Sequence, residues 1–295
     1  MTHSNNLSPL PFYESLDEQD SKKWWAFGDI YPLIVPNETL IPFFFRIGGP
    51  WSLDDIKVYK MCCRPLNQAG DFNNDFSNDF YIDRDENAHY WLDAFNNKIH
   101  VTSSASRTDV YYLGDAELPL EKGRYYIELI FKHTVGSTDY YKYVYSEVFT
   151  CVEEEELSRY TKIEWKNSTS LDTGSVIIPY TAGYTNILYL DTDVCQPTYE
   201  FEEEGENRNG YFFPIKQISY KKYTFKIVAP EYMCDAMRLI RMSDSATITN
   251  KSGLRFDATQ FVMDVSWLEG GHYASADCEF TTDTVIKTIG KAVNI

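Results

Sequence analysis

A series of short, aromatic-rich segments is the feature of this sequence that most constrains its fold. They occupy residues 98–103, 109–113, 124–133 and 140–151, and Gly, Asn and Asp separate them. Aromatic and β-branched side chains suit the pleated, half-buried surface of a sheet. Short strands at this spacing are typical of two packed antiparallel sheets. We therefore predict a mainly β protein whose first folded domain is an immunoglobulin-like β-sandwich.

The predicted organisation is an N-terminal arm over residues 1–36, the sandwich over 37–152 and a second β-rich domain over 153–295. Residues 1–36 are rich in polar residues and proline and show little periodicity. Residues 40–47 and 56–61 read as two strands joined by a turn. The charge run Glu153–Glu156 cannot pack in a core, so we place the domain boundary near Val152, in a solvated linker.

The second domain is predicted to hold strands and one amphipathic helix. Strands are expected at 160–166, 174–180, 186–191, 211–228, 245–249, 260–265 and 275–288, with an acidic loop over Glu200–Gly210. In residues 230–243 a proline precedes apolar residues at helical spacing, which predicts the helix. Its methionines Met233, Met237 and Met242 are interpreted as core packing, with an adaptable binding face as the alternative.

The charge balance excludes some ligands. The chain has 27 basic and 44 acidic residues, a net charge of −17, and binding of nucleic acid depends on Lys and Arg. We therefore expect no specific nucleic-acid binding, although an acidic wall would suit a channel along which DNA slides. No stretch reaches the roughly 18–20 apolar residues of a membrane span, so no membrane association is expected. The six dispersed cysteines are predicted to be reduced, as in a protein made in a cytoplasm.

Motifs of the common enzyme classes do not occur, so no catalytic residue and no cofactor are predicted and the chain is expected not to be an enzyme. The five histidines are scattered and no Cys/His spacing suits zinc. Residues 71–87 are rich in Asp and Asn, but Phe76 and Ile82 stand where a calcium loop of the EF-hand type needs Gly and Glu. We expect no metal there and interpret the segment as a loop with aromatic anchors.

Aromatic residues in the arm and in this loop are the candidate subunit-interface residues. They are Trp24, Trp25, Phe27, Phe72, Phe76 and Phe80. Two alternatives remain open. Trp24, Trp25 and Trp91 could stack on sugar rings, which would make the chain a carbohydrate-binding β-sandwich module of a receptor-binding tail part or of a bacterial surface protein. Acidic pairs such as Asp191 with Asp193, or members of Glu202–Glu206, could serve a glycan hydrolase.

Three stretches of the chain resemble a group of proteins from phages and prophages of Bacteroides and its relatives, including the crAss-like phages. The stretches are YSEVFTCVEEEELSRYTKIEW (145–165), ILYLDTDVCQPTYEFEEEGENRNGYFFPIKQISYKKYTFKIVAPEYMCDAMRLIRMSDSATIT (187–249) and SADCEFTTDTVIK (275–287). They cover roughly the last half of the chain, and the first 140 residues carry no matching motif.

The resemblance implies a structural role in a virion, in the tail or in the ring-like neck that connects head and tail. It implies assembly in the host bacterial cytoplasm as a homo-oligomeric ring in contact with other tail, neck or portal proteins. In such a ring one surface patch meets a different patch on the next copy. The N-terminal arm and the loop over 71–87 are the segments expected to reach neighbouring subunits.

Overall fold

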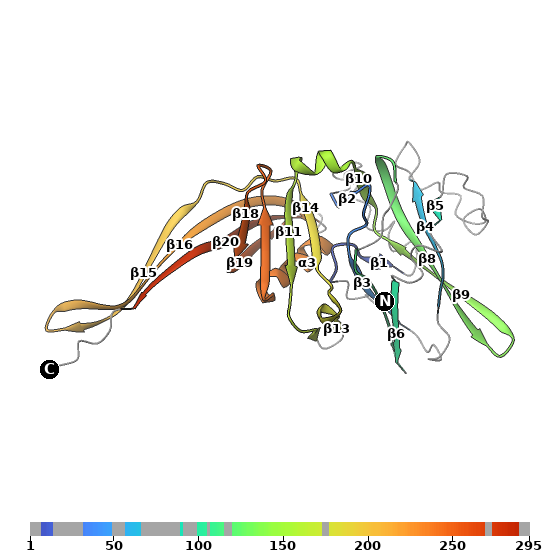
Figure 1. Cartoon of the computed structure of the whole chain (residues 1–295), viewed down its shortest axis with the longest axis horizontal. Coiled ribbons are helices and arrows are strands. Elements are labelled where there is room, and N and C mark those ends of the chain that lie inside the picture. Colours follow the sequence, from blue (N-terminus) through green and yellow to red (C-terminus); the bar gives the residue numbers. More distant parts are fainter. Residues whose placement is uncertain are drawn as a thin grey trace.

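The computed structural model describes residues 7–13, 32–48, 57–65, 89–90, 99–104, 107–114, 120–172, 177–268 and 273–288. Over these residues the chain is mostly β, in several sheets, with a single short α-helix, which confirms the mainly β class. The immunoglobulin-like type of the first sandwich stays a prediction. The molecule is elongated, with β1–β10 towards one end and a long β arm projecting from the other (Figure 1).

Strands β1–β10 form two sheets. They are β1 (Phe12–Tyr13), β2 (Ile34–Pro36), β3 (Phe43–Gly48), β4 (Lys57–Pro65), β5 (His89–Tyr90), β6 (Ile99–Ser104), β7 (Arg107–Tyr112), β8 (Gly123–Val135), β9 (Thr138–Ser146) and β10 (Phe149–Val152). One sheet has the order β1-β9-β8-β10-β2, with β4 paired to β8 and to β5, and the other has the order β3-β7-β6. The predicted strands over 40–47 and 56–61 therefore lie in different sheets and do not pair with each other.

Aromatic side chains join these two sheets. Because successive side chains of a strand point to opposite faces, Phe43 and Phe45 of β3 enter the main core while Phe44 enters a second, smaller one. The ring centroid of Phe12 on β1 lies 4.7 Å from that of Phe43 and 4.3 Å from that of Phe45. The arrangement is that of a β-sandwich.

Described parts of the predicted N-terminal arm are built into the first sheet. β1 pairs antiparallel with β9, and β2 pairs parallel with β10, with Ile34 opposite Thr150. Residues 14–31 lie outside the described residues. The buried core residues continue across Val152 in one cluster that includes Ile163 and Trp165. The division into an arm and two domains stays a prediction.

The second half of the chain adds three sheets and the helix. Its elements are η1 (Glu154–Arg159), β11 (Thr161–Lys166), β12 (Leu171–Asp172), β13 (Ile177–Ile178), η2 (Tyr180–Ala182), β14 (Asn186–Leu190), β15 (Thr198–Arg208), β16 (Tyr211–Pro230), α3 (Glu231–Met237), η3 (Arg238–Met242), β17 (Ser245–Thr249), β18 (Arg255–Ala258), β19 (Gln260–Trp267) and β20 (Tyr273–Thr288). The sheet orders are β14-β11-β17-β18, β12-β13 and β15-β16-β20-β19. Phe256 of β18 packs on Tyr223 of β16, with ring centroids 4.7 Å apart.

The predicted helix over 230–243 is present as α3 followed by the 3-10 turn η3. Met233 and Met237 are buried in the core, which confirms the packing interpretation for these two, whereas Met242 is 60% exposed. The predicted linker at Glu153–Glu156 begins η1, where Glu154 and Glu155 are exposed. Glu156 forms an ion pair with Lys122, with Oε2 and Nζ 2.7 Å apart, which links η1 to the first half of the chain.

The smaller core joins the two halves of the molecule. It comprises Leu7, Phe44, Ile178, Tyr180, Tyr184 and Leu239. Within it the fully buried Asn186 donates from Nδ2 to the Tyr180 hydroxyl at 2.9 Å, and the Tyr184 hydroxyl donates to Asn186 Oδ1 at 3.1 Å. Burial raises the pKa of Tyr184, and a hydrogen bond from Ser8 opposes this rise, so the N-terminal segment contacts the chain just before β14.

A projecting arm and its base groove as the candidate interaction surface

Strands β15, β16 and β20 leave the body of the molecule together and form a three-stranded arm (Figure 1). β19 pairs with β20 only as far as Gln260 opposite Thr281, so the described sheet has three strands beyond that point. β15 has 11 residues, and a rise of about 3.3 Å per residue makes the arm about 35 Å long. The arm is the most extended feature of the described chain.

This arm replaces the acidic loop predicted over Glu200–Gly210, and that prediction is wrong. β15 runs through Arg208, and a two-residue turn, Asn209-Gly210, returns the chain as β16 with Arg208 opposite Tyr211. Asn209 has φ 53° and Gly210 has φ 80°. Positive φ at both positions is the requirement of the type I′ hairpin turn, for which Asn-Gly is the preferred sequence.

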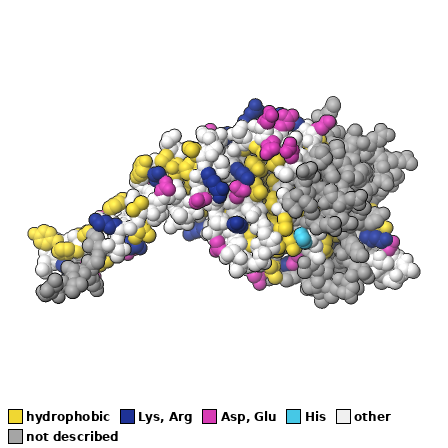
Figure 2. All heavy atoms as spheres, viewed as in Figure 1, with side chains coloured by type: hydrophobic (Ala, Val, Ile, Leu, Met, Phe, Trp, Pro, Cys, Tyr) yellow, Lys and Arg dark blue, Asp and Glu magenta, His cyan; other side chains and the backbone are white. Residues whose placement is uncertain are grey.

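The arm exposes large apolar side chains along its length. They are Tyr199, Phe201, Tyr211, Phe212, Phe213, Val285 and Ile286, each about half exposed or more. Figure 2 shows hydrophobic side chains gathered over the arm and at its far end. Because folded proteins seldom leave contiguous apolar surface in water without an interaction partner, the arm is a candidate interaction surface.

In the body, one face of the sheet β15-β16-β20-β19 packs on the core, and the same face extends along one side of the arm. Tyr223 and Phe225 of β16 point to the core, and by alternation Lys221 and Ser219 lie on the same face further out. Ser219 pairs with Phe201 on one side and with Val285 on the other, and Lys221 pairs with Tyr199. The apolar face of the sheet therefore runs beyond the core. Tyr199, Phe201 and Val285 are 75%, 61% and 66% exposed there.

The opposite face of the arm is charged and internally paired. Glu200 lies 3.6 Å from Lys222, and Glu204 lies 3.8 Å from Lys216. The Tyr220 hydroxyl donates to Glu202 at 2.9 Å, and this hydrogen bond raises the pKa of Tyr220. Such exposed cross-strand pairs contribute little individually but fix the register of neighbouring strands. The glutamates of β15 thus hold the hairpin together.

Two irregularities bend the arm. The register of β15 with β16 shifts between Glu204 and Gly205, and that of β16 with β20 shifts between Ser219 and Lys221. A Cβ at Gly205 would lie 2.6 Å from the ring of Phe212. Only glycine therefore allows the Phe212 ring to lie against the backbone of β15. Bulges increase local twist, which suits a strand pair leaving a sheet.

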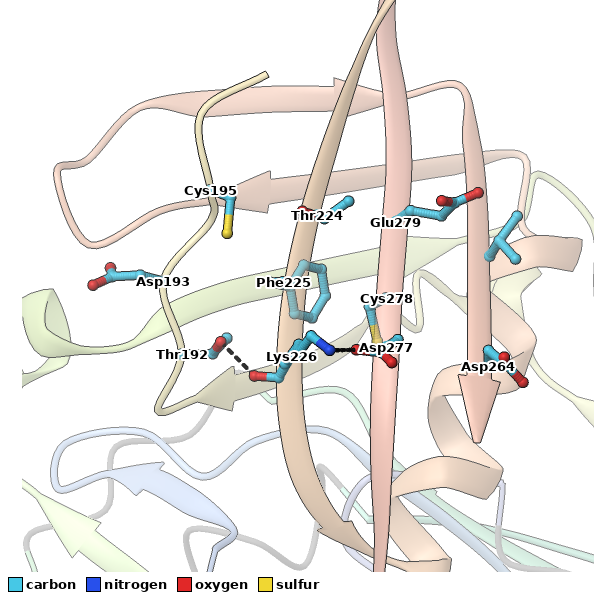
Figure 3. Close-up of a pocket in the computed structure, with 11 residues that line it drawn as sticks. Thr192, Asp193, Cys195, Thr224, Phe225, Lys226, Asp264, Asp277, Cys278 and Glu279 are labelled. Carbon is cyan, nitrogen blue, oxygen red and sulfur yellow. Dashed lines mark hydrogen bonds and ion pairs between the residues drawn. The ribbon is translucent and has the colours of Figure 1, made fainter. Parts of the chain in front are cut away.

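A groove opens at the base of the arm, on the outer face of the same sheet (Figure 3). Thr224 and Lys226 of β16, Asp277 and Glu279 of β20, and Val262 and Asp264 of β19 line it, and the segment Thr192–Cys195 forms its other side. That segment is held to β16 because Thr192 Oγ1 donates to the Lys226 carbonyl at 2.7 Å and the Cys195 amide donates to the Thr224 carbonyl at 2.9 Å. We call this the base groove.

The charge of the base groove is negative. Lys226 Nζ lies 2.7 Å from Asp277, and this contact raises the pKa of Lys226. Asp193, Asp264 and Glu279 add three carboxylates at the rim. Burial raises the pKa of the Cys278 thiol below the groove to about 12, so this thiol stays protonated at neutral pH and is a poor nucleophile. The groove suits a cationic or amphipathic occupant better than it suits covalent chemistry.

Most of the residues singled out from the sequence are not among those that the structure describes. Trp24, Trp25, Phe27, Phe72, Phe76, Phe80 and Trp91 are outside the described residues, as is the calcium alternative over 71–87. Of the acidic pairs, Asp193 lines the base groove while Asp191 binds Lys251 at 2.9 Å. Glu202–Glu206 belong to β15. Two sequence signals indicate the arm, and the predicted acidic loop did not use them. They are the Asn209-Gly210 turn and the alternation of Tyr199 and Phe201 with glutamates.

Comparisons with known proteins found no match, neither to a protein-family model nor to a curated protein. Within the described ranges no cluster of three or more His, Cys, Asp or Glu side chains could hold a metal ion. None of the helices in the described part of the chain has the length and apolar character needed to cross a membrane.

Proposed function

We propose that this chain is a non-enzymatic structural subunit of a bacteriophage virion, in the tail or in the ring-like neck between head and tail. It assembles with copies of itself and with neighbouring virion proteins, and the arm is its main contact. The observation that carries the proposal is the projecting arm with exposed aromatic side chains. The resemblance to phage proteins supports it, because the stretches 187–249 and 275–287 contain β15, β16 and nearly all of β20.

The energetics of the arm favour association. Burying one large apolar side chain contributes about 1.5–3 kcal/mol. Complete covering of the seven exposed apolar side chains of the arm, which are about half exposed or more, therefore contributes up to about 10 kcal/mol. Association costs about 4–15 kcal/mol in lost freedom. The arm is thus large enough to hold two proteins together when a partner surface adds contacts of its own.

The test is native mass spectrometry with negative-stain imaging of the full chain, alone and mixed with the products of neighbouring genes. Closed rings, or rings that form only with a neighbour, are the expected result. A Phe201→Ser variant should lose these assemblies because Phe201 lies on the apolar arm face. Leu254→Ser is the matched control, since Leu254 is 60% exposed on a turn of the body and should leave assembly unchanged.

A chain that stays monomeric with every neighbour would contradict the proposal. Specific retention on glycans by such a monomer would favour the carbohydrate-binding alternative, and release of reducing sugar from a glycan would favour a hydrolase.

A further inference from the structure

The far end of the arm has a composition unlike the rest of β15. Residues 208–213 read Arg-Asn-Gly-Tyr-Phe-Phe, and we call them the arm tip. Tyr211 is 72% exposed, and Phe212 and Phe213 are about half exposed. The tip carries a single charge, that of Arg208, whereas the preceding strand carries glutamates at 200, 202, 203, 204 and 206. The tip is therefore rich in exposed aromatic side chains and carries one arginine, which is paired with Glu206 of the preceding strand.

Arg208 retains hydrogen-bonding capacity for a partner. Its Nε and Nη2 donate to Glu206 Oε2 at 3.1 Å and 2.6 Å. Arginine has five N–H donors, and Nη1 makes no hydrogen bond to a described residue. The Arg208 side chain is 61% exposed, so its guanidinium is accessible to a partner. It can bind a second carboxylate without breaking its contact with Glu206.

The base groove is complementary to the tip. Its carboxylates Asp193 and Asp264 flank the exposed side chain of Val262, whereas Glu279 is paired with Lys222 at 3.3 Å. Its one cation, Lys226, is already paired with Asp277. An aromatic hairpin end whose arginine keeps N–H donors for a second carboxylate thus matches Asp193, Asp264 and the exposed Val262 of the groove.

We propose that the arm tip of one copy docks in the base groove of a second copy. Arg208 binds the rim carboxylates, Asp264 among them, and Tyr211 and Phe212 cover Val262. Because tip and groove are different surfaces at opposite ends of one arm, the contact is heterologous, and repeating it closes a ring or extends a filament. The inference rests on the proposed function, for which it names the contact between copies.

Two single-sided variants test this contact in the full chain. The tip variant carries Arg208→Glu and Tyr211→Ser, and the groove variant carries Val262→Ser and Asp264→Arg. Each should associate with itself at least ten-fold more weakly than the wild type. Mixed together they should form one-to-one dimers, because the mixture keeps one intact tip and one intact groove. Native mass spectrometry counts the copies, and unchanged thermal melting shows that each variant is folded.

Crosslinking gives a second, independent measurement. Cys195 lines the groove and is exposed, whereas Cys63, Cys151, Cys234 and Cys278 are buried. A Tyr211→Cys variant oxidised with diamide should form disulfide-linked multimers through Cys195, since a disulfide requires Cα atoms within about 7 Å. The same variant with Cys195→Ser should not form them.

Other outcomes overturn the inference and separate it from the proposed function. If the groove variant still associates while the tip variant does not, the tips bind each other. If both variants associate like the wild type while Phe201→Ser does not, the arm is the contact but tip and groove are not. If the wild-type chain alone is monomeric at all concentrations, copies do not dock in this way. The proposed function then depends on rings formed with neighbours.

Discussion

Asn186 is fully buried, and its side-chain amide hydrogen-bonds two tyrosine hydroxyls. Buried polar groups are costly unless each finds a partner. Here the partners come from Tyr180 and Tyr184, and Ser8 adds a bond from the N-terminal segment. A single polar cluster thus makes the two halves of the chain depend on each other.

Tyr184→Phe should lower the free energy of unfolding by about 1–3 kcal/mol, because it removes the hydroxyl that donates to the buried Asn186 Oδ1. Urea unfolding followed by circular dichroism measures the change. Tyr140→Phe is the control, since Tyr140 is 51% exposed on β9. Equal effects of the two substitutions would show that the network contributes nothing.

Buried tyrosines also predict how stability depends on alkaline pH. Burial raises the pKa of Tyr180 and of Tyr189 to about 12, from 10.0. Above pH 10 the unfolded chain loses these protons while the folded chain keeps them, so stability present below pH 10 is lost as pH rises towards 12. Each tyrosine removes up to about 1.4 kcal/mol per pH unit. Urea midpoints at pH 9, 10 and 11 should fall slightly over the first interval and mainly over the last, and a constant midpoint would contradict this.

Among the elements, the arm is the one least connected to the core. The main core contains no buried residue between Thr198 and Lys222, whereas Tyr223, Phe225 and Ile227 belong to it. The arm strands are held by cross-strand hydrogen bonds, by pairs such as Lys221 with Asp283 at 2.9 Å, and by the Asn209-Gly210 turn. Folding of the body and formation of the arm are therefore separable.

Shortening the arm should test that separation. Because Glu202 pairs with Ile218, residues 203–217 can be replaced by Asn-Gly to give a shorter hairpin with the same register. The melting temperature of the body should change by less than about 3 °C, since no buried core residue is removed. Self-association should be lost. A large fall in melting temperature would show that the distal arm stabilises the body.

An element could be predicted from the sequence when the interactions that stabilise it lie close together in the chain. The helix over 230–243 could be read because its apolar positions recur at helical spacing and pack on the nearby sheet. The strand over 200–208 could not be recognised from its glutamates, which are typical of solvated loops, since their stabilising partners Lys216, Tyr220 and Lys222 follow the turn. The turn Asn209-Gly210 was the local signal that predicts the hairpin.

The whole molecule has more acidic than basic residues, and many of the basic side chains that the structure describes are paired with acidic ones. The net charge is −17, and Arg208, Lys216, Lys221 and Lys222 of the arm and Arg159 of η1 are paired with carboxylates. A DNA backbone would find few cations from which to displace counterions. If a ring of this chain surrounds phage DNA, the DNA should pass without adhering.

Double-stranded DNA should therefore show no binding to the full chain at about 150 mM salt, with any dissociation constant weaker than the roughly 10⁻⁴–10⁻⁶ M of ordinary non-specific binders. Fluorescence anisotropy with a labelled duplex measures this, and the assembled form should be tested beside the monomer. Tight, salt-dependent binding would contradict the idea of a non-adhesive wall.

The sequence by itself determined the mainly β class, the position of the helix and many strand positions, because side-chain periodicity and turn residues act over a few neighbours. Only the tertiary structure decided which strands pair. It placed residues 40–47 and 57–65 in different sheets, joined the two halves through the smaller core, in which Leu7 and Phe44 meet residues of the second half, and extended β15, β16 and β20 into an arm. Strand pairing depends on contacts between residues far apart in the chain, and no local pattern records which distant strand will cover a given apolar face.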